Sequence, residues 1–278
     1  MAVSNLLRSF KQSVWLGWQM ESNWTDPWLF ALYSVVNPIF GMLVVMFLVY
    51  VGGQAGGKLE AGYLAYVLVG SAFFILVNQT IHTMGWVIHD DREHYEVLKY
   101  IYITPAGAYI YILGRAFSTL LIASISVIVT LLFGVGVLQI PVNLFTANTL
   151  VLIICLVVGI VAITSLGMIL SSITLLTAEH GQMFGETVAG IFFLFCGVVF
   201  PISALPNWAQ TVSYALPLTY WLSALRKAMM GAPITSVSTD LLALLWFTAV
   251  FFILSIAVYR LTDHMARKRG LIDLTTEH

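Results

Sequence analysis

Residues 61–88 read AGYLAYVLVGSAFFILVNQTIHTMGWVI and are followed at once by HDDREHYEVLK at residues 89–99. The first stretch contains no aspartate, glutamate, lysine or arginine. The second is the densest run of charge in the chain, with Asp90, Asp91, Arg92, Glu93, Glu96 and Lys99. A bilayer core excludes charged side chains at a cost of several kcal/mol each. Together, residues 61–88 and 89–99 therefore predict a membrane span that ends in a polar segment lying in water or against another protein.

The composition of the whole chain is that of a membrane protein. Charged residues make up 9% of the 278 residues and hydrophobic residues 60%, and the mean hydropathy is +0.93. These values lie outside the usual range of soluble domains. The net charge of −1 gives no basic surface for nucleic acid. Cys155 and Cys196 fall within apolar stretches, where a free thiol behaves as a small hydrophobe, so we expect neither a disulfide nor a metal site there.

Apolar stretches long enough to cross a bilayer recur along the chain. A span needs about 20 predominantly apolar residues. The stretches predict one all-α integral membrane domain over residues 1–278, with six transmembrane helices. Their approximate ranges are 28–51, 62–88, 109–138, 147–172, 184–203 and 239–262.

The N-terminal residues 4–24 predict an amphipathic helix in the membrane interface rather than a span. Its apolar side chains at helical spacing are Leu7, Phe10, Val14 and Trp18. Arg8, Lys11 and Glu21 interrupt any apolar signal region, so we expect no cleavable signal. The helix serves either as a membrane anchor alone or also as a contact for a cytosolic partner.

The distribution of basic residues predicts the orientation. Six spans place both termini on one side, together with the loops at 89–108 and 173–183. That side carries nine of the 12 lysines and arginines, and the other side carries Lys58, Arg226 and Lys227. The positive-inside rule then places both termini in the cytoplasm. We expect a multi-pass protein of the cell (inner) membrane, with membrane lipid among its partners.

The charged segment predicts a short cytosolic helix over about 91–104. Tyr95, Leu98 and Tyr102 would share one face, with Glu96 and Lys99 on another. The Thr104-Pro105 pair ends the helix, because a proline disfavours helical geometry in the residue before it. The residue chemistry alone leaves a solvated loop helix and a docking helix equally open.

A segment broken by prolines follows the fifth predicted span on the outer side. Residues 204–232 are apolar, and interrupted backbone at membrane depth survives only against protein or a watery cavity. We expect one or two short re-entrant helices that either cap an exit path or seal the outer face. The candidate gate residues are Pro201, Leu205, Pro206, Pro217 and Tyr220. Arg226 lies in this segment and could pair with a lipid phosphate or with Asp240.

Several polar and aromatic side chains fall within or beside the spans. Asn78, Gln79 and His82 should face the bundle interior, either in interhelical hydrogen bonds or along a transport path. Phe74, Phe192 and Phe195 would suit an apolar or amphipathic cargo, although such rings also face lipid or neighbouring helices. Glu179 and His180 border the loop between spans four and five and form either a solvated loop or a second contact with a cytosolic partner. Arg115 is expected to reach the inner interface.

Two motifs imitate catalytic or nucleotide sites. Residues 52–59, GGQAGGKL, resemble a phosphate-binding loop but end in Leu59, which lacks the hydroxyl that holds magnesium. The energy source must therefore be on another chain. His89 and His94 lie five residues apart, a poor spacing for two metal ligands on one helix. We expect no metal, cofactor or catalytic residue in this chain.

The order of these elements resembles the permease subunit of the type-2 ABC exporter family, which exports drugs, lipids or polysaccharides. The resemblance covers essentially the whole chain. The motifs that carry it in the first half of the chain are Arg92-Glu93, Glu96-Val97-Leu98, Ile103-Thr104-Pro105 and Ile112-Leu113-Gly114-Arg115. The motifs in the second half are Phe200-Pro201, Leu205-Pro206-x-Trp208, Pro217-Leu218-Thr219-Tyr220 and Leu225-Arg226. One departure is His94-Tyr95, where the family often has Gly-Thr before the glutamate.

The resemblance implies an exporter half that is not itself an enzyme. Two such subunits, identical or homologous, would face each other, and separate ABC ATPase subunits would bind ATP and magnesium on the cytosolic side. The 91–104 segment would be the coupling helix. The expected coupling residues are Asp91, Arg92, Glu93, Tyr95, Glu96, Leu98, Lys99 and Tyr102.

The expected cargo is hydrophobic or amphipathic, a drug or a lipid-like molecule moved outward. A polysaccharide or lipid-linked glycan is the alternative within the same family. Two more distant alternatives are an ion-coupled carrier, which needs buried carboxylates in its spans, and an intramembrane enzyme, which needs converging catalytic groups at depth.

Overall fold

The computed structural model describes residues 3–23, 26–55, 61–104, 107–142, 147–177 and 181–270. This described part is helical and contains no strand, which confirms the all-α membrane fold. Its α-helices are α1 (Val3–Ser22), α2 (Pro27–Ala55), α3 (Ala61–His89), α4 (Leu98–Ile103), α5 (Ala108–Gly136), α6 (Thr149–Leu176), α7 (Gly181–Phe195), α8 (Asn207–Tyr214), α9 (Pro217–Met229) and α10 (Ile234–Arg269).

Five of these helices are long and apolar enough to cross a membrane: α2, α3, α5, α6 and α10. The fifth predicted span, 184–203, differs from the expectation. It is represented by α7, whose 15 residues extend roughly 22 Å against a hydrocarbon core of about 30 Å. The chain leaves the helix at Cys196 and turns at Gly197, whose φ of 71° is left-handed. A short 3₁₀ turn over Ile202–Ala204 follows, so this part of the chain does not continue as a single helix.

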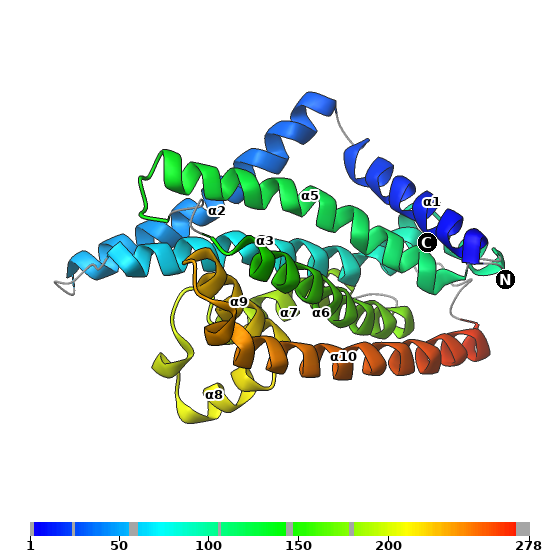
Figure 1. Cartoon of the computed structure of the whole chain (residues 1–278). Helices are drawn as coiled ribbons and strands as arrows, with labels where there is room; N and C mark the ends of the chain where they lie inside the picture. The colour runs from blue at the N-terminus through cyan, green and yellow to red at the C-terminus, as the bar shows by residue number, and fades with distance from the viewer. Residues whose placement is uncertain are drawn as a thin grey trace.

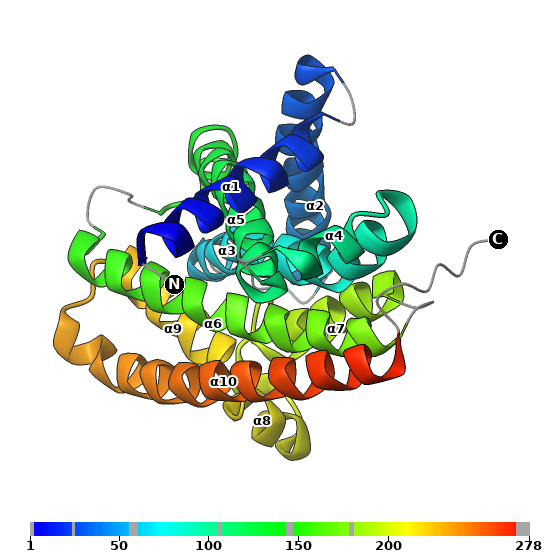
Figure 2. The ribbon, with the colours of Figure 1, turned by 90° about the vertical axis from the view of Figure 1, so that its right-hand side faces the viewer.

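Helix α3 is the centre of the bundle, packed against α5, α6 and α7 (Figure 1). Helix α10 runs along α6, and α9 contacts both of them as well as α3. Helix α1 lies across α5, as Figure 2 shows. The N-terminus and the C-terminal end of α10 lie at one end of the bundle, and α8 and α9 lie toward the other (Figure 1).

The packing of α1 on α5 depends on small residues. A Cβ atom at Gly114 of α5 would overlap Ser13 of α1, and a Cβ at Gly17 would come within 3.1 Å of Arg115 Cδ. Small residues of this kind let helix backbones approach closely in membranes. The amphipathic N-terminal helix is therefore fixed to the third span as well as being a surface element.

Helix α2 contains Pro38, which lacks the N–H that would bond the carbonyl of Ser34 four residues earlier. Ser126 of α5 supplies the missing donor, with its Oγ 2.9 Å from Ser34 O. A backbone carbonyl without a partner is costly in a membrane, because no water is there to replace the bond. This contact therefore both satisfies the break in α2 and joins α2 to α5.

We predict that Ser126→Ala lowers the thermal stability of the purified protein in nanodiscs, by about 0.6–1.7 kcal/mol if the bond has the value usual between membrane helices. Pro38→Ala restores a backbone donor to Ser34 O, so Ser126→Ala should cost much less in the Pro38→Ala background. Equal losses in the two backgrounds would show that the Ser126 hydroxyl does not compensate for the proline.

Candidate functional site

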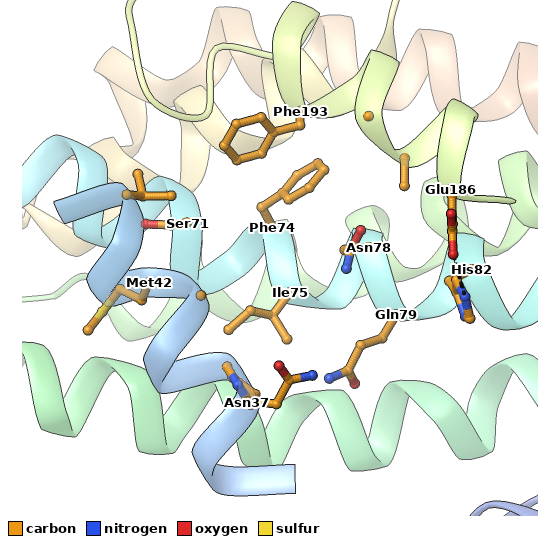
Figure 3. Close-up of a pocket in the computed structure, with 15 residues that line it drawn as sticks. Asn37, Met42, Ser71, Phe74, Ile75, Asn78, Gln79, His82, Glu186 and Phe193 are labelled. Atoms are coloured by element: carbon orange, nitrogen blue, oxygen red, sulfur yellow. Dashed lines mark ion pairs between the residues drawn. The ribbon is translucent and has the colours of Figure 1, made fainter. Parts of the chain in front are cut away.

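A groove runs along the open side of α3, between α2 and α7 (Figure 3). Its cavity has a volume of about 560 Å³. A second cavity of about 340 Å³ continues from it toward α1 and α5, and the two share Asn37, Pro38, Asn78, Gln79 and His82. These volumes are in the range of cavities that take small organic molecules.

Most of the polar side chains of the groove come from one strip of α3, and Asn37 of α2 and Glu186 of α7 add to them. Most of α3 is buried, but Ile75, Asn78, Gln79, His82 and Thr83 are at least partly accessible and recur at helical spacing. All five line one or both cavities. The strip is open because α2 and α7 pack on α3 to either side of it. These polar groups therefore face a cavity at membrane depth, where such groups usually have a functional role.

The two ends of the groove differ in chemistry, as Figure 3 shows. Phe74, Ile75, Met42 and Phe193 line the end nearer Ser71, and His82 and Glu186 lie at the other end, with Asn37, Asn78 and Gln79 pointing into the space between. His82 Nε2 lies 3.9 Å from Glu186 Oε1. Gly185 allows this approach, because a Cβ there would be 3.2 Å from His82 O.

The second cavity is lined by Glu21 at the end of α1, with Phe30, Tyr33 and Ser34 of α2. Burial raises the pKa of the Glu21 carboxyl, and nearby Arg115 opposes this shift. A carboxyl that is costly to ionise gains free energy when a positive group comes to lie beside it.

The structure places the predicted path residues in two groups. Phe74, Asn78 and His82 line the groove. Phe192 is buried, and the ring of Phe195 packs on Trp208 with their centroids 6.0 Å apart, so neither lines the groove. Gln79, which the sequence analysis grouped with Asn78 and His82, lines both cavities. Asn37, Glu186 and Glu21 also line the cavities although the sequence analysis did not place them on a path. The asparagine beside an intrahelical proline, Asn37-Pro38, was a usable signal.

The charged segment after α3 is not the single helix expected over 91–104. Helix α3 runs into a π-helical turn over Asp90–His94, the chain is non-helical at Tyr95 and Glu96, and α4 covers only Leu98–Ile103. Glu96 has a φ of 52°, a left-handed conformation that costs free energy for a residue with a side chain. The break follows from the side chains on both sides of it, which turn into the protein.

The turn is held from within by an ion pair. Asp91 Oδ1 accepts hydrogen bonds from Arg115 Nη1 at 3.2 Å and from Tyr111 OH at 3.1 Å, both on α5. The Asp91 side chain is 0% exposed, and Arg115 is buried instead of reaching the interface as expected. Arg92 donates from Nη2 to Leu175 O of α6 at 3.0 Å. Asp91 and Arg92 therefore fix the segment to α5 and α6.

Helix α4 has an inner and an outer face. Leu98 is buried in a small core with residues of α3, α5, α6 and α10. The ring of Tyr102 lies under Arg267 of α10, 4.9 Å from its guanidinium carbon. The exposed side chains are His94, Tyr95, Glu96, Lys99, Tyr100 and Ile103. Of the predicted coupling residues, Tyr95, Glu96 and Lys99 are on this surface and Glu93 is half-buried. Tyr100 and Ile103 are also on it, although the sequence analysis did not name them, and the coupling role of the whole surface remains a prediction. Glu179 and His180 lie outside the described residues.

The outer segment is built as the prolines require. Pro201 precedes the 3₁₀ turn, Pro206 precedes α8, and Pro217 is the first residue of α9. Leu205 O accepts a hydrogen bond from Gln210 Nε2 at 2.8 Å. Tyr220 OH donates to Tyr214 O at 2.9 Å, and its ring stacks on Phe247 of α10. The five candidate gate residues thus shape the short helices and their junctions, and their role as a gate remains a prediction.

Helix α9 is inserted deeply into the bundle. Trp221 is fully buried and donates from Nε1 to Cys155 O of α6 at 2.9 Å. Gly159 leaves room for the indole, because a Cβ at that position would overlap it. Helix α9 therefore enters the helix bundle, and its Trp221 side chain lies between α6 and the phenyl ring of Phe73.

Arg226 anchors α9 to the turn after α7. Its guanidinium carbon lies 3.6 Å from the ring centroid of Tyr66. The same group donates to Gly197 O and Val198 O, each at 2.8 Å, and to Tyr66 O at 3.2 Å. The alternative partner, Asp240, instead binds Lys227 Nζ at 2.9 Å. Arg226 thus satisfies the backbone carbonyls that the break after α7 leaves open, and a ring face takes the place of a counter-ion.

Comparison with known families agrees with this architecture. The family model described as ABC-2 type transporter matches residues 9–230, which include the first four long spans, α4 and the outer segment with α9. The chain belongs to the ABC-2 type transporter family. Members of this family are membrane subunits for transport and are not catalytic by themselves. The groove, α4 and the outer segment are therefore features of an ABC-2 permease.

Two curated relatives are similar over part of this permease. Nodulation protein J of Rhizobium meliloti (strain 1021) is 31% identical over 99 residues, which cover 36% of this chain and 37% of the relative. Nodulation protein J of Rhizobium leguminosarum bv. trifolii is 34% identical over 102 residues, again 36% of this chain and 37% of the relative. The match spans little more than a third of each relative.

We predict that Gly70→Ala destabilises this ABC-2 permease by about 1–3 kcal/mol, as overpacking usually does. The added Cβ would overlap Arg226 Nη2 and Val198 O and would displace the guanidinium from its carbonyls. Gly62→Ala is the matched control, since it lies on the same helix with no atom within 4 Å of its Cβ. Thermal unfolding in nanodiscs measures both variants, and equal melting temperatures would contradict the anchoring role of Arg226.

Proposed function

We propose that this chain is the transmembrane subunit of an ATP-driven exporter that moves an amphipathic molecule outward across the cell membrane. Separate ABC ATPase subunits would bind ATP and magnesium, and both termini would lie in the cytoplasm. The observation that carries the proposal is the groove on α3, which is polar at one end and apolar at the other. Membership of the ABC-2 family supplies the transport class.

The polar and apolar ends of the groove are arranged in the same direction as the head and tail of a lipid in the inner leaflet. His82 lies 11 residues after Ser71 on α3, a separation of about 16 Å along the helix. His82 is nearer to α4, which the excess of basic residues places in the cytoplasm. A head group would lie among His82, Gln79 and Asn78, and an apolar tail would extend past Ile75 toward Phe193. An amphiphile could therefore enter from the inner leaflet without inverting its orientation.

A glycan-bearing cargo is the second candidate. Asn37, Asn78 and Gln79 provide three side-chain amides around one space, and amides donate to and accept from sugar hydroxyls. The same groups also suit the head of any neutral hydrogen-bonding amphiphile. The apolar end of the groove favours a cargo with a tail over a bare polysaccharide.

The exposed face of α4 is the proposed docking site for the ATPase. Lys99, Tyr100 and Ile103 project from it, and Ile103 is 80% exposed although it is a large apolar side chain. A push on α4 would act on α5 through Asp91 and Arg115, because these groups are paired and buried. It would also act on α6 through Arg92 and on α10 through Tyr102.

A second permease subunit is expected to complete the transport path. The groove is open to the side, and α2 next to it exposes Phe40, Val44 and Phe47. An apolar face beside a groove of this kind is suited to a homologous subunit or to lipid. We propose that two permease subunits face each other across this side.

We predict that Tyr100→Ala combined with Ile103→Ala reduces capture of the partner ATPase, by about tenfold or more in affinity if these side chains form a hot spot. Both side chains are exposed, so the melting temperature of the permease should not change. Trp208→Ala with Val212→Ala, on exposed positions of α8, is the control pair. Co-purification from membranes and ATP hydrolysis by the complex provide the measurements, and full capture by the α4 variant would exclude this face.

We predict that Gly190→Phe blocks transport while the complex still assembles. Gly190 lines the groove with no atom within 4 Å of its Cβ position, so a phenyl ring there would fill the cavity. Ile191→Phe is the control, because Ile191 is exposed on the same helix and does not line the groove. ATP-dependent efflux of an amphiphile from proteoliposomes should be lost only in Gly190→Phe. Efflux equal to that of the control would place the path elsewhere.

A further inference from the structure

The charges around the two cavities are unevenly distributed. Among the described residues that line them, the acids and bases are Glu21, Glu186 and His82. No lysine or arginine lines either cavity in this described set. The head-group end therefore has two carboxyl groups and one imidazole, and with both carboxylates ionised it carries a net negative charge whichever form the imidazole takes.

The surroundings of this end do not reverse the imbalance. Arg115 lies behind Glu21, but it is already paired with Asp91 and lies 4.0 Å from Asp90 Oδ2. Arg92 turns away to the carbonyl of Leu175 on α6. The Asp90 and Asp91 carboxylates thus compensate the Arg115 guanidinium, which therefore brings no uncompensated positive charge to the cavity.

Aromatic faces complete the chemistry of a cation site. Phe30 and Tyr33 line the cavity with Glu21 and could face a cationic head, whereas Phe74 and Phe193 lie at the apolar end of the groove, where the tail would extend. The Phe74 and Phe193 rings meet edge to face with centroids 5.3 Å apart, so they form a fixed apolar wall. Ammonium groups bind to ring faces near carboxylates, with a gain that increases when water is excluded.

We propose that the cargo of this permease carries a positively charged head, an amine or quaternary ammonium group, and that amphiphiles with a phosphate head are rejected. This inference rests on the proposed export function and specifies its substrate class. An ammonium head would lie between Glu21 and Glu186 with the amides of Asn78 and Gln79 around it. A phosphate in the same place would face two carboxylates without a lysine or arginine to pair with it.

The test compares three amphiphiles with the same dodecyl tail: dodecyltrimethylammonium, dodecyl maltoside and dodecyl phosphate. Each is added below its micellar concentration, and at equal membrane-bound concentration, to the permease–ATPase complex in nanodiscs made of a zwitterionic lipid. Stimulation of ATP hydrolysis gives the half-maximal concentration. We expect the ammonium compound to act at a concentration about tenfold or more below that of the phosphate compound, the equivalent of about 1.4 kcal/mol.

Variants of Glu21 and Glu186 test whether these two carboxylates bind the ammonium head. Glu21→Gln and Glu186→Gln keep the shape of the side chain and remove its charge, so each should raise the half-maximal concentration of the ammonium compound severalfold without changing that of the maltoside. Asp26→Asn is the matched control, because Asp26 is exposed at the start of α2 and lines neither cavity. The melting temperature of each variant shows that it is folded.

The outcomes separate the inference from the function on which it rests. If the phosphate compound stimulates hydrolysis as well as the ammonium compound, or if both glutamine variants keep the ammonium preference, the head-charge inference is wrong while export stands. If the maltoside compound stimulates hydrolysis at a lower concentration than the ammonium compound, the head-charge inference is also wrong and the glycan-bearing cargo is favoured. If the complex shows no ATP-dependent efflux of any amphiphile, the proposed function itself fails.

Discussion

The constraint on which this structure depends is that a bilayer offers no water to a backbone carbonyl without a partner. Two of the helix interruptions described above are matched by a side chain from another helix. Ser126 donates to Ser34 O at the proline of α2, and Arg226 donates to Gly197 O and Val198 O where α7 ends. Because each donor belongs to a different helix from its acceptor, the same bonds that satisfy the breaks also hold the bundle together.

The groove is distinguished by polar groups that are not used in this way. Asn78 and Gln79 line the groove, and their strip stays accessible in an otherwise buried helix. In the segment that contains α4, the polar side chains of Asp91 and Arg92 are instead buried in contacts with α5 and α6. Lys99, Tyr100 and Ile103 of α4 are left exposed. The permease thus has one region whose polar groups line a cavity and one whose polar groups fix an exposed surface to three spans.

The sequence predicted the parts that depend on local chemistry. The positions of the long apolar helices, the amphipathic N-terminal helix and the prolines that start the outer helices follow from composition and from the geometry of proline, and the ABC-2 family was predicted from the order of these elements. Three features depended on contacts between distant residues and could not be predicted: the shortness of α7, the burial of Asp91 against Arg115, and the contact between Arg226 and Tyr66. Glu21 was classed with an interface helix, and only the packing of α1 on α5 brought it to a cavity.

The shortness of α7 also affects the surrounding lipid. Its roughly 22 Å falls about 8 Å below the usual hydrocarbon thickness, and hydrophobic mismatch of this size is met by thinning of the bilayer or by other protein at the same depth. Leu194 and Ile191 are exposed on this helix, where lipid or a second protein can cover them. Of the three helices that border the groove, α2, α3 and α7, the last has the shortest apolar length, so any adjustment of the bilayer to the protein is greatest on that flank.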